Sequence, residues 1–121
     1  MIETIWKKNP CRVELPEEWS DFYELVGPTS VEYDDRRRHR RFHARGRAII
    51  EYQSSYYGVL TKDISREGIA FYHEKQLFPA ERVTLLLNSG LQTEVSVMRC
   101  RRIKKNCYEC GVKFMTEVQE D

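Results

Sequence analysis

The sequence predicts a mainly β protein: a small antiparallel barrel or sandwich with a helical extension at its N-terminus. After residue 47 the chain consists of short runs rich in Val, Ile, Leu, Tyr and Phe, separated by polar or glycine-containing turns. Only one stretch, nearer the N-terminus, has clear helical periodicity. The 121 residues correspond to one ordinary domain, with enough chain for a core of moderate size.

Six predicted strands follow one another in the second part of the chain. Alternation of apolar and polar residues is clearest in the fifth run, where Val95 and Val97 share one face. The Lys104–Asn106 stretch predicts a hairpin turn into the last run. Short strands at close spacing indicate antiparallel pairing in a barrel or sandwich. The predicted strands are Ala48–Tyr52, Tyr56–Ile64, Gly68–His73, Val83–Leu87, Gln92–Ile103 and Cys107–Phe114.

The N-terminal part contains one predicted helix, at about residues 16–26. Four aromatic or apolar residues spaced i, i+3, i+4 and i+7 form a stripe on one helix face. A proline at the first position and two glutamates after it favour the start, and a Gly-Pro dipeptide ends the helix. We expect this helix to pack on the domain. The stripe consists of Trp19, Phe22, Tyr23 and Val26.

Charge is distributed very unevenly along the chain, although the formal net charge is only +1. Residues 1–35 carry three basic and nine acidic residues, a net charge of −6. Residues 36–47 contain seven arginines and no acidic residue, a net charge of +7. Residues 48–121 are neutral, with ten residues of each sign. The near-neutral total therefore conceals an arginine-rich arm beside an acidic segment.

The basic residues of this arm are all arginine, which bears on what it can bind. A guanidinium group binds phosphate in a bidentate manner, reads O6 and N7 of guanine, and stacks on flat rings. The plain structural interpretation is a solvated basic stretch, or one that folds onto the acidic segment. The exclusive use of arginine favours a ligand with phosphates and purine bases.

The four cysteines are predicted to be buried or half-buried thiols. Cys107 and Cys110 have the CxxC spacing of zinc and redox sites, but they fall in a predicted hairpin instead of at a helix start. Pairing around the turn places Cys100 roughly opposite Cys110. With no apolar run of about 20 residues and no secretory leader, we expect a cytoplasmic protein, where disulfides are rare. Neither a catalytic set nor a metal site is predicted.

The segment from Asp63 to Gly68, Asp-Ile-Ser-Arg-Glu-Gly, is a second candidate binding feature between two predicted strands. An Asp carboxylate can accept hydrogen bonds from a guanine edge or a ribose hydroxyl. Ser65 points to the same side as Asp63 if the backbone is extended. Gly68 permits a tight turn and a close approach of ligand to backbone. Taken alone, these are also ordinary turn residues.

Together, the arm and the segment from Asp63 to Gly68 resemble the PilZ domain family, the bacterial receptors for cyclic di-GMP. The family pattern is Arg-x-x-x-Arg ahead of the first strand, followed by Asp/Asn-x-Ser-x-x-Gly. The register that fits best aligns Arg37 and Arg41 with the paired arginines, and a shift by four residues would use Arg41 and Arg45 instead.

The resemblance covers about residues 35–116, with the arginine-rich arm at 36–47. It includes Gly111–Phe114, which is similar to the closing strand of the family. Residues 1–34 remain as an acidic N-terminal extension, and 117–121 as a short tail.

The resemblance implies a six-stranded Greek-key barrel whose outer surface binds cyclic di-GMP, with the arm closing over it. It implies a receptor with a downstream protein partner and no enzymatic activity. We also expect no cofactor, no metal and no contact with a membrane. The alternative is a small RNA- or DNA-binding barrel that uses the arm, with Tyr52, Tyr56, Tyr57 or Tyr72 stacking on bases. The implied cyclic di-GMP contacts are Arg36, Arg37, Arg41, Asp63, Ser65 and Gly68.

Overall fold

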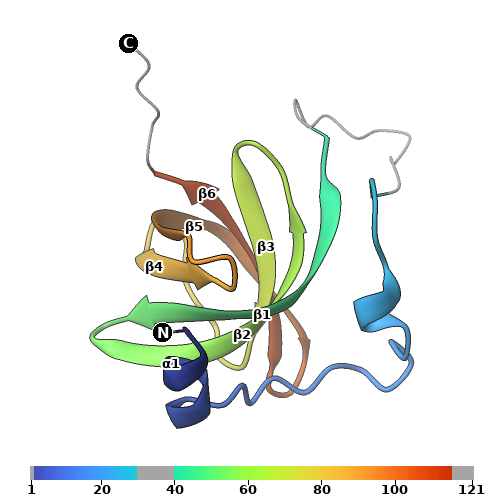
Figure 1. The fold of residues 1–121 in the computed structure, drawn as a ribbon, viewed down its shortest axis with the longest axis horizontal. Coiled ribbons are helices and arrows are strands. Elements are labelled where there is room, and N and C mark those ends of the chain that lie inside the picture. The colour runs from blue at the N-terminus through green and yellow to red at the C-terminus, as the bar shows by residue number, and fades with distance from the viewer. Residues whose placement is uncertain (1, 30–39, 116–121) are drawn as a thin grey trace.

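Six antiparallel strands close into a barrel, which confirms the predicted fold class (Figure 1). This computed structural model describes residues 2–29 and 40–115. The strand order around the barrel is β1-β2-β3-β6-β5-β4. Strands β4, β1, β2 and β3 are successive neighbours, which is the Greek-key arrangement. The strands are β1 (Phe42–Tyr52), β2 (Ser55–Ile64), β3 (Gly68–His73), β4 (Arg82–Leu87), β5 (Gln92–Lys104) and β6 (Cys107–Phe114).

Apolar side chains from all six strands fill the barrel interior. Ile50 of β1 pairs in register with Leu85 of β4, and both are fully buried. On β5, Val95 and Val97 are buried in the same core, whereas Glu94, directly before Val95, is exposed. The predicted shared face of Val95 and Val97 is therefore confirmed, and the period-two pattern of the strand follows from this burial.

A second apolar cluster lies on the outer face of the barrel, beneath residues 2–29, which we call the N-terminal segment. Its buried members are Phe22 of this segment, Leu60 of β2, Tyr72 of β3 and Cys107 of β6. In Figure 1 the segment is the blue chain that passes around the outside of the barrel. β3 is covered on both faces, with Phe71 in the barrel core and Tyr72 beneath the N-terminal segment, which explains why every residue of this strand is buried.

The predicted helix at residues 16–26 is wrong. The N-terminal segment instead contains α1 (Ile2–Lys8) and a 3-10 turn, η1 (Phe22–Glu24). Of the predicted stripe only Phe22 is fully buried, and Val26 is 80% exposed. A helix this short is marginal without tertiary support, and the aromatic contacts with the barrel form without helical geometry. Across the described ranges, none of the helices is long and apolar enough to cross a membrane.

Gly58 of β2 marks a close passage of the N-terminal segment over the barrel. A Cβ atom at this position would lie 2.8 Å from the carbonyl oxygen of Asn9 and 2.9 Å from the amide nitrogen of Cys11. We therefore expect Gly58→Ala to displace the segment while the barrel stays folded. Both tryptophans of the chain, Trp6 and Trp19, lie in this segment, so their fluorescence reports on its position.

The expected result is a shift of tryptophan emission to longer wavelength in native buffer, with a loss of about 1–3 kcal/mol in the free energy of unfolding. Gly46→Ala is the matched control, because its Cβ atom would meet only Thr61 Oγ1, at 4.0 Å. Unchanged emission in Gly58→Ala would contradict the close contact.

Candidate ligand-binding site

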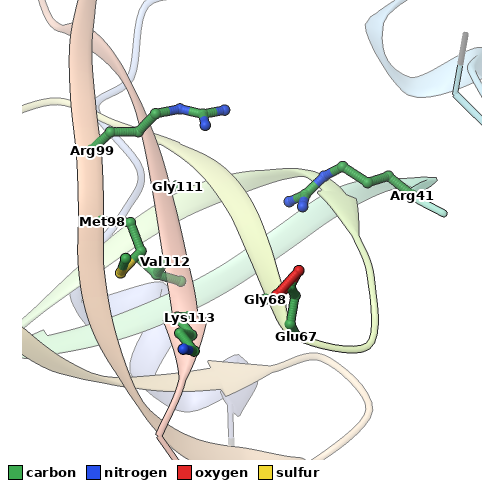
Figure 2. A pocket seen from close by; sticks show the side chains of 8 residues that line it. All are labelled: Arg41, Glu67, Gly68, Met98, Arg99, Gly111, Val112 and Lys113. Carbon is green, nitrogen blue, oxygen red and sulfur yellow. The ribbon is translucent and has the colours of Figure 1, made fainter. Parts of the chain in front are cut away.

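A basic pocket of about 270 Å³ lies between the start of β1, the β2–β3 turn and the β5–β6 pair. Two predicted site residues, Arg41 and Gly68, line it, together with Arg99 of β5 and Lys113 of β6. In Figure 2, Arg41 and Arg99 reach over the pocket from opposite sides. Glu67 is the acidic residue in its lining. Among the described residues of the lining, three cationic side chains surround one carboxylate, and this excess of positive charge favours an anionic ligand.

Asp63 holds Arg41 at the rim of this pocket. The Nε of Arg41 donates a hydrogen bond of 2.8 Å to Oδ1 of Asp63, and the two side chains are only 14% and 7% exposed. The Nζ of Lys62 lies 3.9 Å from the other carboxylate oxygen. Because Nε makes the contact with Asp63, the terminal nitrogens of Arg41 can turn toward an anion in the pocket. Asp63 thus orients the arginine.

The motif from Asp63 to Gly68 runs from the end of β2, through the turn, to the first residue of β3. The amide of Ser65 donates to the carbonyl of Gly68 (2.9 Å), and the amide of Glu67 donates to the hydroxyl of Ser65 (3.3 Å). Ser65 is 9% exposed. Gly68 is not in the left-handed region; a Cβ there would lie 2.1 Å from the carbonyl oxygen of Val112. Ser65 and Gly68 therefore shape the turn and its packing on β6.

Arg36 and Arg37 lie outside the described residues, so their role at the site stays a prediction. The predicted first strand begins at Ala48, but β1 begins at Phe42, so residues 42–47 of the predicted arm are part of the strand. Phe42 pairs in register with Ile64, the last residue of β2. The pairing of β1 with β2 therefore continues into the arginine-rich stretch.

The last two arginines of the predicted arm face the N-terminal segment. The guanidinium carbon of Arg45 lies 4.5 Å from the ring centroid of Phe22, and that of Arg47 lies 4.8 Å from that of Trp6. Both distances are typical of cation–π contacts. Arg41, which belongs to both motif registers, lines the pocket, whereas Arg45, the second arginine of the register shifted by four, does not.

Glu109 of β6 is a buried carboxylate that joins two basic residues on the outer face of the barrel. It is 6% exposed, accepts a 2.8 Å hydrogen bond from Lys62 and forms a 2.9 Å ion pair with Arg101. Burial acts to raise the pKa of Glu109. The hydrogen bond from Lys62 and the charges of Lys62 and Arg101 outweigh burial, so the pKa is lowered.

This lowered pKa predicts an acid-sensitive contribution to stability. A carboxyl with a lower pKa in the folded than in the unfolded state stabilises the fold above its unfolded pKa, and the effect disappears as the pH falls through the folded pKa. We expect Glu109→Gln to lower the free energy of unfolding by about 2 kcal/mol at neutral pH. The ion pair with Arg101 adds little to this value, because the Arg101 side chain is largely exposed and solvent screens its charge.

Urea denaturation across pH checks this expectation, with Glu94→Gln at an exposed position as control. The difference between wild type and Glu109→Gln should shrink between roughly pH 5 and pH 3. A difference that stays constant over this range would contradict the ion-pair assignment.

Cys100 and Cys110 are register partners on β5 and β6, as the predicted hairpin requires, and their sulfur atoms lie 3.4 Å apart. The CxxC pair, in contrast, is divided between two clusters: Cys110 packs in the barrel interior and Cys107 in the outer cluster. Residues i and i+3 of a strand point to opposite faces, so this spacing brings no second thiol to Cys107. Among the described residues, no group of three or more His, Cys, Asp or Glu side chains could hold a metal ion.

The four tyrosines considered for base stacking do not share one exposed surface. Tyr72 is 2% exposed beneath the N-terminal segment. Tyr57 packs edge-on against the ring of His73, with 5.1 Å between centroids. Tyr56 is 40% exposed, and Tyr52 is half-buried. This distribution gives no support to a nucleic-acid surface built on these rings.

Comparison with known proteins agrees with the observed fold and with the resemblance to the PilZ domain family. Residues 35–121 match the PilZ domain. A similar solved structure is that of the Bacillus subtilis inhibitor of motility (MotI/DgrA), with a TM-score of 0.52 and 22% sequence identity. The match covers 69% of this chain and 44% of that chain, and at this identity it shows the fold alone. No match was found among curated proteins. With the PilZ match extending over most of its length, the chain belongs to the PilZ domain family.

Proposed function

We propose that this protein is a cytoplasmic receptor for cyclic di-GMP in bacterial signalling, acting through a downstream protein partner. PilZ domains are receptor and effector domains, not enzymes, and the family binds cyclic di-GMP. The observation that carries the proposal is the position of Arg41, which Asp63 holds at the rim of a basic pocket.

The pocket chemistry suits a ligand with two phosphates and two guanines. Arg41 and Arg99 offer guanidinium groups that bind phosphate through charge-assisted hydrogen bonds and stack on guanine rings. Lys113 adds a third positive charge. The volume of about 270 Å³ is below the usual range for small-molecule sites, so part of a dinucleotide would lie outside the pocket. We propose that Arg36 and Arg37 contact the part of the dinucleotide that lies outside the pocket.

Calorimetry on the full chain with cyclic di-GMP, GTP and a short single-stranded RNA tests the proposal. We expect heat of binding with cyclic di-GMP and none comparable with GTP or RNA. Absence of heat with cyclic di-GMP, from protein shown to be folded by circular dichroism, would overturn the proposal. RNA binding with a steep salt dependence that survives Asp63→Ala would support the nucleic-acid alternative instead.

A further inference from the structure

Cys100 and Cys110 form a thiol pair with the geometry of an unclosed disulfide. All four cysteines of the protein are free thiols, and these two sit directly opposite each other on β5 and β6. Their sulfur atoms are 3.4 Å apart, whereas a disulfide bond needs about 2.05 Å. Neighbouring antiparallel strands hold opposed Cα atoms about 4.5–5.5 Å apart, within the range that a disulfide spans. Closure therefore needs side-chain rotation without a change of register.

The two thiols differ in accessibility and in charge. Cys100 is half-buried and Cys110 is completely buried. The hydrogen bond from Cys110 lowers the pKa of Cys100 to about 7; burial opposes this, and the backbone amide of Leu77, 3.5 Å away, assists it. The pKa of Cys110 is raised, because it donates to Cys100 and is buried. Near neutral pH, Cys100 is thus the reachable thiolate and Cys110 the protonated partner.

We propose that Cys100 and Cys110 are an oxidation site that closes to an intramolecular disulfide when the protein meets a peroxide. The Cys100 thiolate attacks one peroxide oxygen, the O–O bond breaks, and the released hydroxide takes a proton to become water. The sulfur of Cys110 then attacks the sulfenic sulfur of Cys100, whose hydroxide leaves with the Cys110 proton as a second water. Both sulfurs are oxidised by one electron each, and the peroxide is reduced by two.

The other two cysteines lie apart from this chemistry. Cys107 packs in the outer cluster, and burial raises its pKa to about 11, which keeps it a protonated thiol. Cys11 belongs to the N-terminal segment, and burial raises its pKa also. The oxidation site therefore lies specifically between β5 and β6. It adjoins Arg99 and Gly111, which are themselves register partners in the pocket wall.

Peroxide treatment of the folded, reduced full chain tests this proposal. After hydrogen peroxide, alkylation of the remaining thiols and peptide mapping, we expect two of the four thiols to be lost and a Cys100–Cys110 cross-linked peptide to appear. A dithiol reductant should restore all four. The rate of thiol loss should rise with pH through about 7, as the reactive thiolate forms.

Two variants sharpen the assignment. In Cys110→Ala, Cys100 should stop at the sulfenic acid, which dimedone traps; Cys107→Ala should still form the cross-link. Wild-type mapping carries the test even where Cys110→Ala fails to fold. The proposal is overturned if folded wild type keeps four thiols in excess peroxide, or if other cysteines are linked while Cys100 and Cys110 remain alkylatable.

Discussion

Replacing Gly68 with alanine is expected to lower the free energy of unfolding by about 3 kcal/mol. The added Cβ atom would lie 2.1 Å from the carbonyl oxygen of Val112, a backbone atom that cannot rotate away. Gly68 pairs in register with Lys113, so relief of the overlap requires β3 and β6 to separate locally. Urea denaturation of wild type and Gly68→Ala measures the difference.

Gly46→Ala is the control for this prediction. Gly46 lies in β1, is not in the left-handed region, and has only Thr61 Oγ1 near the added atom, at 4.0 Å. We expect its free energy of unfolding to remain within about 0.5 kcal/mol of wild type. If the two glycine variants lose equal stability, the approach of β6 is not what requires glycine at position 68.

The second large effect concerns ligand binding at Arg41. If the proposed receptor function holds, Arg41→Ala should weaken cyclic di-GMP binding by about 100-fold, the equivalent of losing charge-assisted hydrogen bonds worth roughly 2.7 kcal/mol. Among the described residues, the variant also leaves Lys62, at 3.9 Å, as the cation beside Asp63. Calorimetry measures the affinity, and circular dichroism verifies that the barrel is intact.

Arg45→Ala is the matched control, since it removes an arginine of the same stretch that stacks on Phe22 and does not line the pocket. Its affinity should stay close to that of wild type. A large loss in Arg45→Ala would instead favour the motif register shifted by four residues. Wild-type affinity in Arg41→Ala would contradict the site.

The strands could be predicted because the signals behind them are local. Alternation and turn residues act between near neighbours, so the hairpin at Lys104–Asn106 also predicts the pairing of Cys100 with Cys110. The structure of residues 16–26 could not be predicted correctly, because their buried apolar side chains pack on the outer face of the barrel. That face is formed by distant strands and has no local signal in the sequence. Trp19 packs on Tyr72 of β3, with 5.3 Å between ring centroids, and this contact needs no helix.

Residues of the candidate site could be predicted from the sequence only where they belong to a recognisable motif. Arg41 and Asp63 belong to such motifs, and the structure brings them together. Arg99 and Lys113 were missed, because exposed basic residues on separate strands have no signature in one sequence. The hairpin register contained a usable signal: it places Gly111 opposite Arg99, and a Cβ atom at Gly111 would meet that side chain at 3.5 Å.

The pairing of β1 with β4 limits how a partner protein can recognise this molecule. These two strands would be the edges of an open sheet, and in the described part of the chain they bond to each other from Ala48 to Glu51. Where β1 and β4 pair, their backbone donors and acceptors are already used in hydrogen bonds between the two strands. A partner peptide therefore cannot bind along this seam by adding a strand to the sheet. A partner at this seam must recognise side chains, so its specificity should respond to surface substitutions.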